Sequence, residues 1–505
     1  MNKNLLFTIL GPSVFLLTLL IDVPENMGII DLAKFKFGDN LEHVGNSAAA
    51  FRLIGIIIWM AIWWISEAVP IAITALLPIV LFPSTGVFSI ENTGANYGHK
   101  YIFLFIGGFI LANAIQKWKL HKRIALTIIR FIGSSTEQII LGFMIATAFL
   151  SMWISNTATT VMMLPIGISV IAQLNDHPDT IENENKTFGK ALMLAIAYSA
   201  SAGGVATLIG TPPNILLASF ISDNFEIEIS FFQWLKIGLP VSIVLLFFIW
   251  FYITKISFRL KKTSFPGGKE EIKGLLHLMG PMKKEEKRIL FIFGATVFCW
   301  ITKTYFFDFF LNEDIAKQAN KAADPIIALI SAIFLFIIPS SNKKEKLMNW
   351  KEAVNIPWGI LILLGGGLAI AEGVESSGLA NWLGMQFDLF QSFSLLIVLA
   401  IIIASVNLLT EITSNMATTA MLLPVILPLS KSMGVEPFIL LTGATLAASC
   451  AFMLPVATPP NAVVFGSKLL KISDMVKAGL WINIFSIILI LLATYFILPM
   501  LWGLD

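Results

Sequence analysis

Two polar stretches of nearly the same composition interrupt apolar sequence, half the chain apart. The first reads SNTATTVMMLP over 155–165, and the second reads SNMATTAMLLP over 414–424, an offset of 259 residues. Their serine and threonine hydroxyls and their asparagine amides can donate and accept hydrogen bonds without carrying a charge. This chemistry favours reversible binding of ions and small polar molecules over bond breaking.

A second polar break follows each stretch. It reads GTPPN at 210–214 and ATPPN at 457–461, and the pair Gly203-Gly204 is expected to interrupt the span that holds the first of these breaks as well. Proline interrupts a helix because it lacks a backbone N–H and clashes with the preceding turn. Unwound backbone is tolerated inside a membrane only where protein buries it or where it lines a wet cavity. Paired interruptions in corresponding halves of a chain therefore predict the binding site of a transporter.

The elements that must position these breaks are membrane helices. The chain has 505 residues, of which 56% are hydrophobic and 13% are charged, and its mean hydropathy is +0.82. These values are typical of a polytopic helical membrane protein. The net charge of +2 gives no indication of nucleic-acid binding. The two cysteines, Cys299 and Cys450, are too few for a disulfide framework.

We expect an all-α fold with eleven transmembrane spans and two re-entrant hairpins. A span requires about 20 apolar residues. The first apolar run is interpreted as a span because no small-residue cleavage pattern of a signal peptide follows it. The expected spans are 5–21, 51–66, 69–87, 101–118, 189–222, 235–257, 289–309, 325–339, 358–375, 437–470 and 478–501.

The two hairpins are expected at 138–172 and 393–434, around the SN stretches. Each segment could instead form two full spans, and loop charge does not separate the two possibilities because both leave the next loop on the same side. We favour hairpins because the arms of the first are slightly short for full spans and its tip is polar.

Basic residues predict the orientation of the chain. Lysine and arginine concentrate in three segments that should face the cytoplasm, namely 117–123, the linker 258–288 and 343–351. The N-terminus is then inside and the C-terminus outside, and the amphipathic segment 121–135 should lie along the interface. The GG motif at 107–108 recurs at 366–367 on a span that runs the opposite way. The two halves are therefore expected to be antiparallel repeats.

Broken helices expose backbone groups that suit ions of both signs. The first N–H groups of a helix favour anions, whereas the last carbonyl groups favour a hard cation such as Na⁺. We expect the helices after the breaks to begin at Thr157, Asn214, Met416 and Asn461, and the preceding carbonyl ends to lie near Trp153, Gly210, Thr413 and Ala457. No break contains lysine or arginine, so charge balance for a bound anion would depend on a removable cation. We interpret this as a physical route to coupled transport.

Several residues have competing interpretations. Serine, threonine and asparagine often only connect membrane helices, but duplication at one offset favours a site. The glycine run 365–367 is interpreted as close helix packing. Glu67 is interpreted as a carboxylate at a helix start. Glu411, within the arm before Asn415, could be a structural partner or a proton site.

Together these motifs resemble the divalent anion/sodium symporter family, the carriers of dicarboxylates, citrate and sulfate. The resemblance extends from the WISE motif at 64–67 to the ATPPN break. It implies a homodimer in a bacterial inner membrane, in which a transport part slides as an elevator against a scaffold. The implied parts are scaffold spans at 1–100, a first transport part at 101–234, scaffold spans with the basic linker at 235–357, a second transport part at 358–477 and a last span at 478–505.

The resemblance also implies which residues bind the dicarboxylate and which bind each Na⁺. The dicarboxylate would contact Ser155, Asn156, Thr157, Thr211, Ser414, Asn415 and Thr458. One Na⁺ would be held by Ser151, Ser155, Asn156 and the backbone of Gly210. A second Na⁺ would be held by Thr410, Thr413, Asn415 and Ala457.

One residue departs from the family pattern. Met416 stands where a threonine would complete the second SNT motif, and a thioether is at most a weak acceptor. The leading expectation is Na⁺-coupled uptake of C4-dicarboxylates of the succinate, malate and fumarate class. A sodium-independent dicarboxylate exchanger and a citrate or sulfate carrier of the same family remain alternatives.

Other classes of protein fit the sequence less well. An arsenite-type efflux subunit would not be expected to carry paired SN stretches. A channel does not need two antiparallel repeats around one site. An intramembrane enzyme would need clusters of histidine, aspartate or cysteine within spans, whereas the five histidines fall in loops or at span ends.

Overall fold

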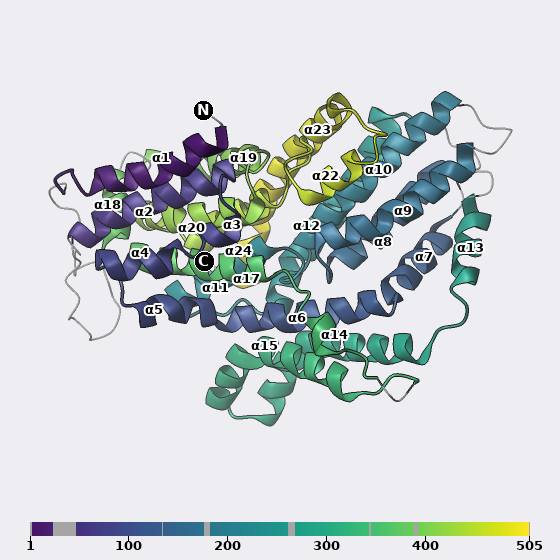
Figure 1. Cartoon of the computed structure of the whole chain (residues 1–505), viewed down its shortest axis with the longest axis horizontal. Helices are drawn as coiled ribbons and strands as arrows, with labels where there is room; N and C mark the ends of the chain where they lie inside the picture. The colour runs from purple at the N-terminus through teal and green to yellow at the C-terminus, as the bar shows by residue number, and fades with distance from the viewer. Residues whose placement is uncertain are drawn as a thin grey trace.

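Polar and proline-rich breaks divide the apolar sequence into helices of very different length. The computed structural model describes residues 3–23, 47–133, 135–175, 182–260, 268–342, 345–387 and 392–503. Within these ranges the ordered elements are helices, and Figure 1 shows how they are arranged.

The first half and the linker combine long helices with several very short ones. They are α1 (Lys3–Thr18), α2 (Ser47–Ser66), α3 (Ile71–Thr74), α4 (Leu77–Thr85), α5 (Ile90–Ala95), the 3-10 helix η1 (Asn96–Gly98), α6 (Lys100–Lys117), α7 (Leu120–Ile132), α8 (Thr136–Ser151), α9 (Asn156–Asn175), α10 (Glu182–Val205), α11 (Pro212–Phe225), α12 (Phe231–Phe251), the π-helix η2 (Tyr252–Ser257) and α13 (Gly268–Leu278).

The second half repeats the order of two helices around an SN stretch followed by a broken helix. Its helices are α14 (Lys284–Phe310), α15 (Glu313–Ile337), α16 (Trp350–Ala353), α17 (Trp358–Ser376), α18 (Leu379–Gln386), α19 (Leu395–Leu409), α20 (Asn415–Ser432), α21 (Pro437–Ala448), α22 (Pro459–Phe465), α23 (Ile472–Leu492), the π-helix η4 (Ala493–Ile497) and α24 (Leu498–Trp502).

Membrane spanning is supported by the length and composition of these helices. Ten helical segments of the described residues are long and apolar enough to cross a membrane. They include α9 and α20, whereas α8 and α19, the helices that precede the SN stretches, are apolar but shorter. The chain is thus an all-helical, polytopic membrane protein, as the sequence predicted.

The two halves interlock around the SN stretches. In each half two helices joined by an SN stretch, α8 with α9 and α19 with α20, form a helical hairpin, a term used from here on for the helix pair alone. The first helix of each pair packs on the broken helix of its own half, α8 on α10 and α19 on α21. Between the halves, α9 packs against α22 and α20 packs against α11. This exchange brings the two SN stretches, 259 residues apart in sequence, to one place.

The two glycine motifs allow segments from distant parts of the chain to pack closely against each other. In Figure 1, α14 and α15 lie along one edge of the molecule beside α6, and α15 packs against α6. A Cβ on Gly107 would lie 2.6 Å from the backbone of Ala328, and one on Gly366 would lie 2.4 Å from Ala75 O. The interpretation of the second glycine motif as helix packing is therefore confirmed.

The structure corrects the expected limits of the broken helices. The Gly203-Gly204 pair lies inside α10 and does not break it, because the unwound linker to α11 is 206–211. In the second half the linker between α21 and α22 is longer, 449–458, and α22 ends at Phe465 rather than near 470. Proline pairs mark where the second helix starts but give no indication of where the first one ends.

Two expected loops are partly helical. The linker 258–288 contains α13, whose Ile272 is buried where α13 packs against α7 and α9, and it also contains the first turn of α14. The acidic segment before 325 belongs to α15, which begins at Glu313 because the Asn312 side chain accepts a hydrogen bond from Ile315 N at 3.0 Å. Charge pattern alone therefore underestimates helix length at the membrane surface.

Candidate functional site

The tip of each hairpin is fixed by the same hydrogen bond. The Ser151 hydroxyl donates to Asn156 Oδ1 at 2.6 Å. In the other half the Thr410 hydroxyl donates to Asn415 Oδ1 at 2.8 Å. The two pairs are related by the offset of 259 residues. Ser151 and Thr410 are completely buried, so a hydroxyl and an amide oxygen stand together at the base of each tip.

A second hydroxyl holds the main chain of each asparagine. Thr160 donates to Asn156 O, and Thr419 donates to Asn415 O, both at 2.8 Å. The side chain and the backbone of both asparagines are therefore oriented by the protein itself. Such preorganisation lowers the entropy that a ligand must lose on binding.

The helices that follow the breaks begin one or two residues earlier than expected. They start at Asn156, Pro212, Asn415 and Pro459. In α9 the Ala158 N–H is bonded to Ser155 Oγ, but the N–H groups of residues 156–157, like those of residues 415–417 in α20, have no acceptor within their own helix and can face an anion.

The helices that start with Pro-Pro cannot do the same. Their first N–H groups belong to Asn214 and Asn461, which donate to Thr211 O at 3.2 Å and to Thr458 Oγ1 at 3.3 Å. The expectation of four anion-facing helix starts is therefore wrong for α11 and α22, because prolines supply no donor and the next donor is already bonded.

The asparagines of the PPN motifs hold the unwound linkers instead. Asn214 Nδ2 donates to Thr207 O at 2.8 Å, with longer bonds to Gly204 O and Val205 O. Asn461 Nδ2 donates to Leu454 O at 3.0 Å, with a longer bond to Ala451 O. Both asparagines are completely buried. They fix the shape of the breaks and do not begin helices aimed at a ligand.

A cavity of about 810 Å³ lies between the two hairpin tips. This volume is within the range of roughly 300–1,000 Å³ that is usual for small-molecule sites. All seven predicted substrate residues line it, together with three of the predicted Na⁺ ligands that are not among the seven: Ser155, Asn156, Thr157, Thr211, Ser414, Asn415 and Thr458, then Gly210, Thr413 and Ala457. Ser151 and Thr410 lie buried behind the tips and do not line the cavity.

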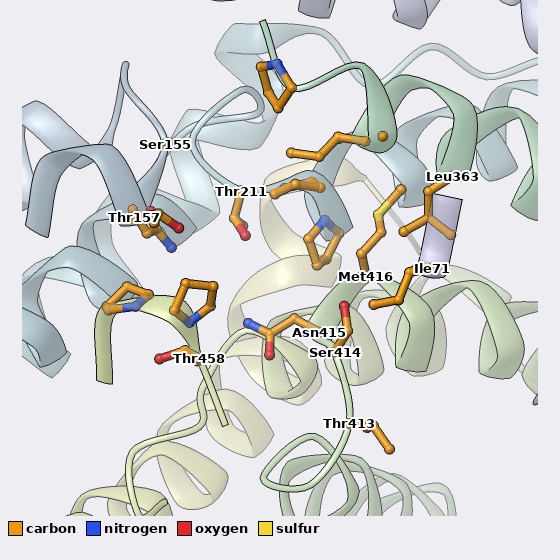
Figure 2. A pocket seen from close by; sticks show the side chains of 18 of the residues that line it. Ile71, Ser155, Thr157, Thr211, Leu363, Thr413, Ser414, Asn415, Met416 and Thr458 are labelled. Atoms are coloured by element: carbon orange, nitrogen blue, oxygen red, sulfur yellow. The ribbon is translucent and has the colours of Figure 1, made fainter. Parts of the chain in front are cut away.

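The cavity has a polar side and an apolar side. In Figure 2, Thr157, Ser155 and Thr211 lie opposite Met416, which has the apolar Leu363 and Ile71 and the hydroxyl of Ser414 beside it. Phenylalanine and isoleucine side chains of helices and of the unwound segments complete the apolar lining: Ile65, Phe105, Phe109, Ile209, Ile360 and Ile412.

The hydroxyls at the mouths of the breaks differ in their availability. The Ser155 hydroxyl accepts the Ala158 N–H at 3.3 Å, and the Thr458 hydroxyl accepts the Asn461 N–H. Ser414 and Thr211, at the starts of α20 and α11, make no such capping bond. All four hydroxyls keep an O–H that can donate to a ligand in the cavity, and those of Ser414 and Thr211 also keep both lone pairs as acceptors.

One residue of the first tip was missed from the sequence. A Cβ on Gly204 would lie 2.4 Å from Asn156 Oδ1, so the backbone of Gly204 directly adjoins the Asn156 amide. The expected neighbour, Gly210, lines the cavity, and its own α-carbon faces Gly204 O. The signal that could have identified Gly204 is the GG pair, which was assigned to the helix break.

Glu67 does not lie at a helix start, and that interpretation is wrong. It follows the end of α2, has a φ of 49°, and lines the cavity four residues before α3 begins. The N-cap of α3 is Pro70.

Glu411 is a structural partner of the second break. It lies in the turn after α19, not inside the arm, and it is 2% exposed. Its carboxylate accepts the backbone N–H groups of Phe452, Met453 and Leu454 at 2.7–3.2 Å and the Asn483 amide at 2.7 Å. A buried carboxylate is stabilised by such donors. Of the two roles that the sequence left open for Glu411, a structural partner or a proton site, these contacts support the structural one.

The groups at the two tips suit alkali cations and anions rather than transition metals. Within the described ranges no group of three or more histidine, cysteine, aspartate or glutamate side chains is placed to hold a metal ion. Hydroxyl, amide and carbonyl oxygens are the ligands of hard cations, and none of these groups ionises near neutral pH.

The sequence is similar to those of known membrane transporters. Residues 43–503 match the family described as "Sodium:sulfate symporter transmembrane region". The chain is 45% identical over 501 residues to the sodium-dependent dicarboxylate transporter SdcS of Staphylococcus saprophyticus, covering 98% of this chain and 92% of that protein. It is 43% identical over 509 residues to SdcS of Staphylococcus aureus, covering 99% and 92%.

Two solved structures share the fold at low sequence identity. MtrF of Neisseria gonorrhoeae, described as representing a class of antimetabolite efflux pumps, aligns with a TM-score of 0.56 at 12% identity, covering 97% of this chain and 94% of that one. The YdaH transporter of Alcanivorax borkumensis aligns with a TM-score of 0.52 at 12% identity, covering 100% and 98%.

Proposed function

Because the chain belongs to the sodium:sulfate symporter family, we propose that it takes up C4-dicarboxylates of the succinate, malate and fumarate class together with Na⁺. The observation that carries this proposal is the duplicated hydroxyl–asparagine pair, Ser151 with Asn156 and Thr410 with Asn415, behind one cavity. The two SdcS relatives, named as sodium-dependent dicarboxylate transporters, support the same substrate and ion.

One Na⁺ would be bound in each half. The first would be held by Ser151, Ser155, Asn156 and Gly210, with Gly204 adjoining, and the second by Thr410, Thr413, Asn415 and Ala457. The hydrogen bond from hydroxyl to amide oxygen at each tip supports this proposal because it keeps two oxygens in contact where a cation needs several.

The dicarboxylate would bridge the two hairpin tips. One carboxylate would meet the first turn of α9 with Ser155, Asn156 and Thr157, and the other would meet Ser414 and Asn415. The free hydroxyl of Thr211 and the hydroxyl of Thr458 complete the predicted set. The apolar side around Met416 suits a hydrocarbon middle better than a compact tetrahedral anion, which favours a dicarboxylate over sulfate.

Coupling follows from charge. The cavity lining contains no lysine, arginine or histidine in the described residues. A dianion would therefore enter a partly enclosed cavity without a fixed counter-charge, which is unfavourable. Bound Na⁺ supplies the missing charge and leaves again when the substrate is released.

Movement would take the form of an elevator. We propose that the interlocked hairpins and broken helices move as one transport part against scaffold spans, with the divisions at 1–100, 101–234, 235–357, 358–477 and 478–505. The packing of α9 on α22 and of α20 on α11 supports a common moving body. The proposal includes eleven spans, two re-entrant hairpins, a homodimer and a bacterial inner membrane with the N-terminus inside and the C-terminus outside.

The test is uptake of radiolabelled succinate into proteoliposomes. An inward Na⁺ gradient should stimulate uptake, and replacing Na⁺ by choline should abolish the stimulation. Uptake that needs internal dicarboxylate but no Na⁺ would make the protein an exchanger. No succinate uptake under either condition, with citrate uptake instead, would contradict the proposed substrate.

A further inference from the structure

Glu67 is the single ionisable side chain in the cavity wall formed by the described residues. Every other lining residue is apolar or an uncharged hydroxyl, amide, thioether, proline or glycine. The wall of a site proposed for anions thus carries one fixed negative charge and no fixed positive charge.

The Glu67 carboxylate does not hold its own segment together. It makes no hydrogen bond and no ion pair with a described residue. Neighbouring residues brace the turn between α2 and α3 instead, because Trp64 Nε1 donates to Ile71 O at 3.1 Å and Ala68 N donates to Ser66 Oγ at 3.4 Å. Glu67 is exposed and has freedom to face the cavity.

The backbone at this position does not favour glutamate. With a φ of 49°, Glu67 occupies the left-handed region, which glycine and asparagine adopt more readily. Neither local conformation nor side-chain bonding therefore accounts for a glutamate here. What remains is the effect of its charge on the cavity.

A carboxylate beside a partly enclosed cavity attracts cations and repels anions, and the effect weakens with added salt. Resting on the proposed function, we propose that Glu67 determines the strength of ion coupling: it draws Na⁺ into the cavity and disfavours a dicarboxylate that arrives without Na⁺.

The two effects act in the same direction on coupling. Without Na⁺ the cavity has one negative charge, so a dianion is repelled. Two bound Na⁺ reverse the sign of the cavity, so the same dianion is attracted. With Gln at position 67 the empty cavity would be neutral, and the contrast between uptake with and without Na⁺ would shrink.

The experiment measures succinate uptake in proteoliposomes against Na⁺ concentration for wild type, Glu67→Gln, Glu67→Asp and Glu226→Gln. Glu226 is a matched control because it is also an exposed glutamate with a left-handed backbone, φ 54°, at the end of α11 and outside the cavity. We expect Glu67→Gln to raise the half-maximal Na⁺ concentration roughly threefold or more. At saturating Na⁺ the KM for succinate should stay the same or fall.

The two remaining variants separate charge from shape. Glu67→Asp keeps the charge and should keep the Na⁺ dependence of wild type, as should Glu226→Gln. The difference in Na⁺ dependence between wild type and Glu67→Gln should also diminish at high ionic strength set with choline chloride. A purely structural role would not give this salt dependence.

An unchanged half-maximal Na⁺ concentration in Glu67→Gln overturns the inference, and so does an equal shift in Glu226→Gln. If Glu67→Gln shows no uptake, the Na⁺ concentration that half-maximally raises the melting temperature of the purified variant gives the same comparison. If wild type shows no Na⁺-dependent succinate uptake, the proposed function fails, whereas the thermal titration still tests Glu67 by itself.

Discussion

The two halves of the molecule share the geometry of their asparagines but differ in the support behind it. In the first half the Thr159 hydroxyl is completely buried and has no hydrogen-bond partner, because position 154 is isoleucine. In the second half Thr418 occupies the matching position, and its hydroxyl lies 2.5 Å from that of Thr413. The first tip thus has an isoleucine side chain at the position where the second has a threonine hydroxyl that forms a hydrogen bond.

A larger difference concerns Glu411. Its counterpart at the offset of 259 residues is Met152. The linker beside Glu411 runs over 449–458, whereas the corresponding linker of the first half is only 206–211. The longer linker leaves more backbone N–H groups to satisfy, and the carboxylate accepts three of them. The hydroxyl–asparagine pair that an ion would contact is therefore the same in both halves. The side chains that support this pair from behind differ between the halves.

The strongest way to break the comparison is to remove the shared asparagines. Asn156→Ala and Asn415→Ala should each lower Na⁺-driven succinate uptake by roughly 100-fold or more, since each removes a preorganised amide oxygen from the site. Radiolabelled uptake at matched protein density measures this. Asn113→Ala, at a residue that bonds Asn355 O outside the cavity, should retain uptake. Normal uptake by either asparagine variant would remove that half from the site.

Glu411 gives the next largest effect. Glu411→Gln replaces an acceptor oxygen by an NH₂ group facing backbone donors, and we expect it to reduce stability by about 2–4 kcal/mol. Met152→Leu, at the matching position of the first half, should change stability by less than about 1.5 kcal/mol. Thermal unfolding of the detergent-solubilised proteins compares the two. Equal effects would mean that the halves are supported in the same way.

Met416 and Thr157 sharpen the comparison within the cavity. Met416→Thr restores a hydroxyl on the apolar side and should shift the ratio of citrate to succinate uptake by roughly three- to tenfold. The reciprocal Thr157→Met should lower succinate uptake. Competition assays with a panel of di- and tricarboxylates give the ranking. An unchanged ranking in Met416→Thr would show that this side chain does not select the substrate.

The smallest expected effect tests the two buried threonines. Thr418→Val removes a bonded hydroxyl and should reduce stability by about 0.5–1.5 kcal/mol. Thr159→Val removes a hydroxyl that has no partner and should be neutral or slightly stabilising. The melting temperatures of the two variants should therefore move apart, and a larger loss for Thr159→Val would contradict the assigned difference.

Much of the fold follows from the sequence because its signals are local. Apolar runs, proline pairs and the repeated SN stretches indicate the helices on both sides of each break and the polar residues that line the cavity. Ser151 and Thr410 could be named only through the family resemblance, since nothing local shows that they bond Asn156 and Asn415.

What the sequence could not give depends on contacts between distant segments. The role of Glu411 rests on backbone N–H groups some 40 residues later in the chain. The sequence does not show that these N–H groups lack an acceptor within their own segment. Glu67 was assigned to a helix start because composition does not show the left-handed turn. The Pro-Pro helix starts were overestimated as anion sites because their first free N–H groups bond locally.

The central claim is that each half holds one Na⁺ through a hydroxyl and an asparagine. The most direct measurement is the Hill coefficient of Na⁺ activation of succinate uptake in proteoliposomes, for wild type, Ser151→Ala and Thr410→Val. We predict a coefficient above 1 in wild type that falls towards 1 in either variant, with a higher half-maximal Na⁺ concentration. A coefficient of 1 in wild type, or one unchanged in both variants, would contradict two cation sites related by the repeat.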